Sequence, residues 1–320
     1  MTKRTKTVVS VLLFVLVFGG LLLTATFCDL QISKILTADI LAEHNYYTND
    51  PFGTLFEILG SGPVYLMISF AAQILFWHVM RKFTKRGGKE LLELLLLVIS
   101  TVSYYAFAKQ STEYFLQHVN AEPMQEETFV MLIELSLALM GTIIATIAVR
   151  NYKEESIEKL VMFAFAVLCV AAVANILVGV VKGPVGRMRF RAMNTIGDFS
   201  KFTPWYVING AMEDEELMRL FGTTDACRSF PSGHTCAAGM SYCLVMLIPA
   251  LNIENKWKKA ALWILPIVFT GTVAVSRIMV GAHFMSDVLM GGTISFLSMI
   301  IFREIFVVKG ANVKALFGKE

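Results

Sequence analysis

Eight long apolar runs, separated by short polar stretches, dominate the chain. Each is close to the roughly 20 apolar residues that a helix needs to cross a bilayer. The pattern therefore predicts an all-α, polytopic membrane protein with about eight spanning helices. The runs cover residues 7–27, 58–80, 91–108, 128–149, 160–181, 235–253, 260–276 and 282–302. The first is too long for a secretory signal and lacks an A-x-A-like exit, so we expect it to be an anchor.

The composition agrees with this class. Of the 320 residues, 56% are apolar and 17% are charged, with a mean hydropathy of +0.62. Soluble domains average roughly 45–50% apolar and 25% charged residues, so an ordinary soluble enzyme is excluded. The net charge of +3 is small and its basic residues are scattered. A nucleic-acid partner would need them gathered on one face, so we expect none.

Lysine and arginine are concentrated in alternate connections. Eighteen lie at the N-terminus, in 81–89, 150–159 and 256–259, and in the tail 303–319, whereas the connections 28–57 and 109–127 hold only Lys34 and Lys109. Because positive charge in short loops marks the cytoplasmic side, both termini are predicted to be cytoplasmic. By alternation, the loop 182–234 and the turn 277–281 face outward.

Three outward pieces carry candidate chemistry. KGPVGRMR runs from Lys182 to Arg189, PSGH includes Ser232, Gly233 and His234, and SR-x5-H-x3-D includes Arg277, His283 and Asp287. Fixed cations and the backbone amides of a helix N-terminus favour phosphate, so these pieces predict an oxyanion site.

The histidines suggest how a bound phosphate would react. His283 and Asp287 are four residues apart, which on a helix places both on one face. Asp287 could then hold one ring nitrogen and leave the other as a nucleophile, while His234 protonates the departing oxygen. This hypothesis is a covalent phosphoryl transfer without a metal or other cofactor.

At these residues the chain resembles the type-2 phosphatidic acid phosphatase superfamily, which includes glucose-6-phosphatase. The family pattern is Lys, six residues, Arg-Pro; then Pro-Ser-Gly-His; then Ser-Arg, five residues, His, three residues, Asp. The three motifs occur here in order and at the family spacing, between 182 and 287, except that Phe190 stands where proline is usual. The resemblance implies that His283 is the nucleophile, Asp287 orients it and His234 is the general acid. It also implies that the phosphate ligands are Lys182, Arg189, Ser232, Gly233 and Arg277.

The resemblance further implies a six-helix phosphatase core within a single domain, 1–320. Family members have three spans before the first motif and this chain has five, so we interpret the third and fourth spans as an added pair. Arg187 and Arg191 are alternative phosphate ligands. By residue type, however, these two, with Lys201, Arg219 and Arg228, are more typical of solvated loop charges or headgroup contacts. His118 is interpreted as a packing or interfacial residue.

The predicted function is therefore a membrane phosphatase acting on lipid phosphates or diphosphates, such as phosphatidic acid, phosphatidylglycerol phosphate or a polyprenyl diphosphate. A site at the membrane edge gives an amphiphile lateral access. Two alternatives stay open: a sugar-phosphate phosphatase of the glucose-6-phosphatase kind, and a phosphate-binding transporter without turnover. Membrane lipids are the expected surroundings, with no obligate protein partner. Compact loops without an N-x-S/T sequon are compatible with a bacterial plasma membrane.

Overall fold

The protein is a bundle of long helices. The computed structural model describes residues 3–37, 46–48, 50–83, 88–119 and 121–309, and 82% of it is helical. No strand occurs in these ranges, so the all-α prediction is confirmed. The helices are α1 (Lys3–Thr37), α2 (Pro51–Gly60), α3 (Gly62–Lys82), α4 (Lys89–His118), α5 (Thr128–Arg150), α6 (Glu154–Val185), α7 (Phe190–Ile196), α8 (Asp214–Phe221), α9 (Gly233–Gly239), α10 (Leu247–Ala250), α11 (Lys256–Met279) and α12 (Met285–Phe302). Short 3-10 helices are η1 (Glu122–Glu126), η2 (Phe199–Lys201) and η3 (Met240–Met246), and the π-helical turn η4 (Arg303–Val308) extends α12.

All eight predicted spans are present. Eight helical segments of the described chain are long and apolar enough to cross a membrane: Val8–Thr37, Pro51–Lys82, Lys89–His118, Thr128–Arg150, Glu154–Ile196, Gly233–Ala250, Lys256–Met279 and Met285–Val308. Most extend past the apolar runs at one or both ends, because helical hydrogen bonding continues into the polar turns that flank them.

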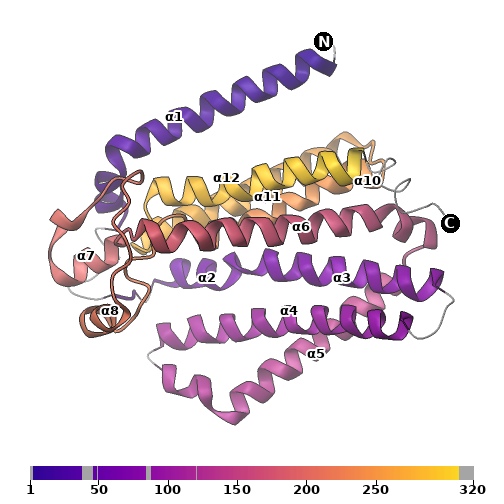
Figure 1. Ribbon diagram of the computed structural model, residues 1–320, viewed down its shortest axis with the longest axis horizontal. Helices are drawn as coiled ribbons and strands as arrows, with labels where there is room; N and C mark the ends of the chain where they lie inside the picture. The colour runs from indigo at the N-terminus through magenta and orange to yellow at the C-terminus, as the bar shows by residue number, and fades with distance from the viewer. Residues whose placement is uncertain (1–2, 38–45, 49, 84–87, 120, 310–320) are drawn as a thin grey trace.

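The spans lie side by side in a layered arrangement (Figure 1). α6 runs through the middle, with α11 and α12 on one side and α2, α3, α4 and α5 on the other. α1 lies outermost beside α12 and diverges from it. The main apolar core fills the space between α3, α6, η3 and α12, where Ile74, Phe163, Met240 and Met299 are fully buried.

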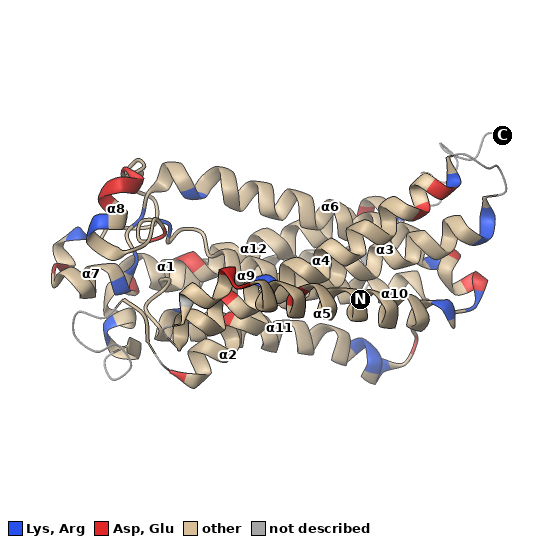
Figure 2. Ribbon diagram, turned by 90° about the horizontal axis from the view of Figure 1, so that it is seen from below, with Lys and Arg blue, Asp and Glu red and all other residues tan. Residues whose placement is uncertain are grey.

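The two ends of the bundle differ. α7, α8 and the start of α2 lie at one end, and the end of α3, the start of α4 and the α10–α11 connection lie at the other (Figure 1). Most charged residues lie toward these ends (Figure 2), as expected for a protein whose middle faces lipid. Lys85, Arg86, Lys314 and Lys319, which contribute to the predicted sidedness, lie outside the described residues.

Candidate active site

The first motif leaves α6 at the end that carries α7. Gly186 ends α6 in a left-handed conformation (φ 55°) and faces the carbonyl oxygen of Gly210, which a β-carbon would meet at 1.7 Å. The chain therefore turns sharply here. Lys182 lies one turn earlier on α6, and a β-carbon on Gly233 would lie 3.6 Å from its Nζ atom. The ammonium group of Lys182 in the first motif thus lies next to the backbone of the second motif.

Arg189 is buried just before α7 (5% exposed). Its guanidinium pairs with Asp225 (Nη2 to Oδ2, 2.5 Å) and donates to the carbonyl oxygens of Asp225 and Ala282. Burial opposes the charge of Asp225, but Arg189 and Lys182 hold its pKa below the usual value. The predicted phosphate ligand therefore already has an anionic partner, which sequence reasoning did not find.

Phe190 is the first residue of α7, a position where proline is favoured because no helical partner exists for its amide. The phenylalanine occupies the same place and packs edge-on against Phe284, with ring centroids 6.5 Å apart. The departure from the family pattern thus preserves the helix start and adds apolar contact beside His283.

The second motif begins α9. Ser232 caps the helix by accepting a hydrogen bond from the Thr235 amide at 3.3 Å, and its own amide donates to the Asp287 carbonyl at 3.0 Å. Gly291 of α12 makes this contact possible, because a β-carbon there would lie 2.3 Å from the Ser232 carbonyl oxygen. The second and third motifs are therefore held together by direct backbone contact.

The third motif corrects one expectation. His283 and Asp287 do not share a helical face, because α12 begins only at Met285. Asp287 instead caps the start of α12 by accepting a hydrogen bond from the Phe284 amide at 2.8 Å. His283 Nδ1 donates to the Ser229 carbonyl oxygen at 2.7 Å, whereas the nearest Asp287 oxygen is 3.8 Å away. Asp287 therefore lies near the ring without forming the predicted direct hydrogen bond.

Ser229 connects the two residues. Its hydroxyl donates to Asp287 Oδ2, and its carbonyl accepts from His283 Nδ1. The imidazole is thereby fixed in one tautomer, with its proton on Nδ1 and a lone pair on Nε2. Burial, followed by the charge of Arg189, lowers the pKa of His283 to about 3. The ring is therefore neutral at neutral pH, as a nucleophile requires.

Arg187 and Arg191 are not the solvated charges that their residue type suggested, since they are only 1% and 5% exposed. Arg187 bridges Asp287 (2.6 Å) and Asp29 of α1 (3.0 Å). Asp29 also accepts from the Ser286 amide at 3.0 Å, so it ties α1 to the site. Lys201, Arg219 and Arg228 are exposed, as predicted.

Arg191 is held differently. Its guanidinium stacks over Tyr46 and Tyr47, at 4.4 and 4.9 Å from the ring centroids, and its amide donates to the Gly281 carbonyl. Its Nε atom is buried with no hydrogen-bond partner in the part of the chain that the structure describes. An anion entering the site could satisfy this donor.

His234 belongs to the second motif and Arg277 to the third. The His234 ring lies 5.2 Å from the Tyr114 ring, and electrostatic interactions link it to Arg277, His283 and Lys182. Its Nε2 atom is buried and has no hydrogen-bond partner among the described residues. Arg277 is fully buried, and its Nη2 donates to the Gly53 carbonyl. The structure thus gathers both histidines with cations from the first and third motifs.

Sequence reasoning missed the partners of these residues. They are Asp29, Glu57, Tyr114, His118, Asp225 and, directly before the second motif, Ser229. Only Ser229 has a sequence signal, its place three residues before Ser232. Tyr114 and His118 belong to α4, so the helix interpreted as part of an added pair reaches the site. The other residues could not be recognised from the sequence, because isolated polar residues in apolar runs form no pattern.

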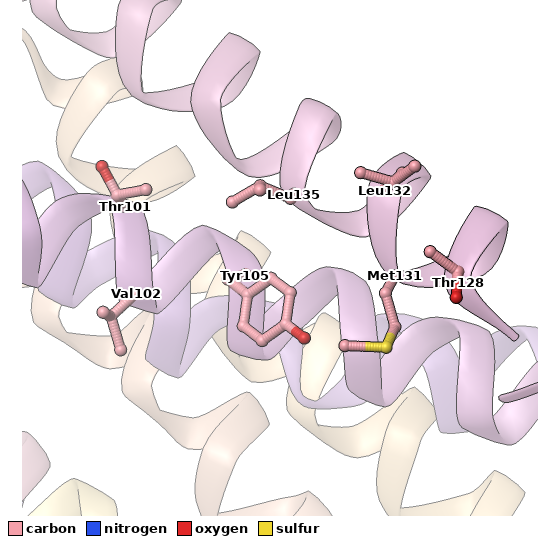
Figure 3. A pocket seen from close by; sticks show the side chains of 7 residues that line it. All are labelled: Thr101, Val102, Tyr105, Thr128, Met131, Leu132 and Leu135. Carbon is pink, nitrogen blue, oxygen red and sulfur yellow. The ribbon is translucent and has the colours of Figure 1, made fainter. Parts of the chain in front are cut away.

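A separate cavity of about 450 Å³ lies between α4 and α5 (Figure 3). Thr101, Val102 and Tyr105 of α4 line one side, and α5 lines the other with mostly aliphatic side chains. It contains none of the motif residues. Within the described chain, no group of three or more His, Cys, Asp and Glu side chains is arranged to hold a metal ion.

Comparison with known proteins agrees with the motifs. The model of the PAP2 superfamily matches residues 163–310, which include all three motifs and begin within α6. Neither a curated protein nor a solved structure matches the chain. The predicted resemblance is confirmed over this range, and it indicates a phosphatase-type activity. The chain is an all-α, polytopic membrane protein whose residues 163–310 match the model of the PAP2 superfamily.

Proposed function

We propose that this protein is a membrane phosphatase that cleaves phosphomonoesters or diphosphates of lipids through a phosphohistidine intermediate. The observation that supports it most is the state of His283: buried, neutral, and held at Nδ1 by the Ser229 carbonyl. A ring fixed in this way presents its Nε2 lone pair in one direction, as in-line attack requires.

The first step forms a bond between His283 Nε2 and phosphorus while the bond to the leaving oxygen breaks. His234 donates a proton to that oxygen. Lys182, Arg189 and Arg277 offset the charge that spreads over the phosphoryl oxygens. Asp287 stabilises the positive charge that develops on the His283 ring, at 3.8 Å and through Ser229.

The second step releases phosphate. Water attacks the phosphorus atom and gives a proton to His234, which is neutral after the first step. The phosphorus–nitrogen bond breaks, and its electron pair returns to His283 Nε2. Both histidines then regain their starting protonation states, and no metal ion or redox cofactor takes part.

A lipid substrate is supported by an apolar groove next to the second motif. It has a volume of about 570 Å³, within the usual range for small-ligand sites, and lies between α1, α11 and α12. Phe14, Ile267 and Val288 are among its lining residues, and Thr235, the neighbour of His234, reaches it. A lipid chain held there would leave its phosphate near the catalytic histidines.

We also propose that the site faces outward from a bacterial plasma membrane, with both termini cytoplasmic. The support is the excess of Lys and Arg in alternate connections. The first turn of α11, which carries three of these lysines, lies at the end of the bundle opposite α7 (Figure 1).

Phosphate release from a panel of substrates tests the proposed function. We expect micellar phosphatidic acid, phosphatidylglycerol phosphate or a polyprenyl diphosphate to be hydrolysed with EDTA present, and vanadate to inhibit the reaction. A preference for soluble sugar phosphates would support the glucose-6-phosphatase alternative, and phosphate binding without release would support the transporter. Strict dependence on added Mg²⁺ or Zn²⁺ would contradict the metal-free mechanism.

The same assay in sealed vesicles of known orientation tests sidedness. Substrate added to the outward face should be hydrolysed without permeabilisation. Hydrolysis only at the cytoplasmic face would contradict the proposed orientation.

A further inference from the structure

A buried carboxylate, Glu57, and a histidine, His118, lie behind Arg277. Both belong to the part of the chain that precedes the range matched by the family model. Glu57 of α2 approaches Arg277 (Oε1 to Nη1, 2.6 Å), and its other oxygen contacts His118 Nε2 at 2.9 Å. Glu57 and His118 are 6% and 9% exposed, and Arg277 is 0% exposed. Arg277 is therefore connected to α2 and α4 entirely inside the protein.

The hydrogen bonds assign protons along this chain of groups. A backbone carbonyl can only accept, so His118 Nδ1 donates to the Thr48 oxygen, 2.6 Å away. Glu57 is a carboxylate because it pairs with Arg277. His118 contacts Glu57 Oε2, the oxygen that does not face Arg277, and fixes the carboxylate from that side.

The arginine retains a donor. Nη2 is used by the Gly53 carbonyl, and Nε lies 3.3 Å from its own neighbour, Ser276 Oγ. Nη1 is close to Glu57 but forms no hydrogen bond of regular geometry with any residue the structure describes. Each terminal nitrogen carries two N–H groups, so Nη1 and Nη2 each keep one that faces neither Glu57 nor Gly53 and is available to a ligand oxygen.

We propose that Glu57 and His118 are positioning residues that aim the Arg277 guanidinium at the phosphoryl group in the transition state. This inference rests on the proposed phosphatase function. A guanidinium anchored along one edge needs no reorganisation when charge develops on the phosphoryl oxygens. Glu57 also limits the affinity of Arg277 for the ground-state phosphate, because the carboxylate already neutralises the positive charge of the guanidinium.

The proposal predicts a specific division between kcat and KM. Glu57→Gln keeps the size of the side chain but removes the charge that orients both neighbours. We expect kcat to fall roughly 10- to 100-fold, in line with the cost of small misplacements, while KM stays unchanged or falls. The inhibition constant of vanadate, which mimics the five-coordinate phosphorus, should rise in parallel, whereas that of inorganic phosphate should not rise.

A double-mutant cycle tests whether the effect passes through Arg277. In an Arg277→Lys background, which keeps the charge but loses the planar fork, Glu57→Gln should change kcat by no more than about twofold. A full, multiplicative loss in that background would overturn the proposal. His118→Gln is the second variant, in case Glu57→Gln fails to fold. It should likewise lower kcat while KM stays unchanged or falls.

Glu134→Gln provides the matched control. Glu134 is also fully buried, on α5, and accepts hydrogen bonds from Thr112 and from Gln125 (2.9 Å) rather than from an arginine. It should keep wild-type kcat and vanadate inhibition. Wild-type values in folded Glu57→Gln and His118→Gln would overturn this inference alone. Turnover that survives His283→Ala would instead refute the proposed function.

Discussion

Replacing His283 by alanine is expected to lower kcat by about 10⁴-fold or more. The substitution removes the nitrogen that forms the covalent bond to phosphorus, so the reaction loses its two-step route. The remaining cations can still bind substrate, so KM should change far less. Initial rates of phosphate release, measured at saturating lipid substrate in detergent, give the effect.

His78→Ala is the matched histidine control, because His78 lies on α3 with its ring against Phe83, at the end of that helix away from α2. It should retain wild-type turnover. Thermal unfolding of each variant separates a chemical loss from misfolding. A folded His283→Ala protein with near-normal kcat would refute the nucleophile assignment.

Replacing His234 by glutamine is expected to lower kcat by roughly 10²- to 10⁴-fold for a lipid phosphate. An alkoxide is a poor leaving group, and general acid catalysis supplies an acceleration of this size. Nitrophenolate leaves without a proton, so p-nitrophenyl phosphate should show a much smaller loss. The ratio of the two losses in the same purified variant is the measurement.

Equal losses on the two substrates would contradict the role of His234 as the acid. The His283→Ala variant serves as the comparison, because removing the nucleophile should slow both substrates strongly. The leaving-group dependence therefore distinguishes a proton donor from a residue that only shapes the site.

The spans and motifs could be predicted because their signals are local. A run of about 20 apolar residues is sufficient to indicate a spanning helix. The spacing of Lys182 and Arg189, or of Arg277 and His283, is likewise contained in a few turns of chain. The structure brings these pieces together at one end of the bundle, as the motifs implied.

The geometry of His283 and Asp287 could not be predicted from spacing alone. Four residues imply a shared helical face only if both residues are helical, and the carboxylate of Asp287 instead caps α12 after His283. The capping preference of aspartate at a helix start thus outweighed the helical periodicity. The backbone carbonyl of Ser229 takes the predicted place of the carboxylate.

The buried arginines show a second limit. Arg187 contacts Asp29, which is 158 residues away, and Arg277 contacts Gly53, which is 224 residues away. From residue type alone, arginines are expected to be exposed. Only the tertiary structure shows that a buried carboxylate pairs with each of these two. Asp29 and Glu57 therefore become parts of the site only through the packing of α1 and α2 beside α11 and α12.

The stereochemical course at phosphorus tests the central claim, a covalent phosphohistidine mechanism, most directly. A phosphorothioate ester made chiral with two oxygen isotopes would be hydrolysed in water of the third isotope, and the configuration of the released thiophosphate would be determined. Two in-line displacements, first by His283 and then by water, predict retention of configuration. Inversion would show a single attack by water and would contradict the mechanism.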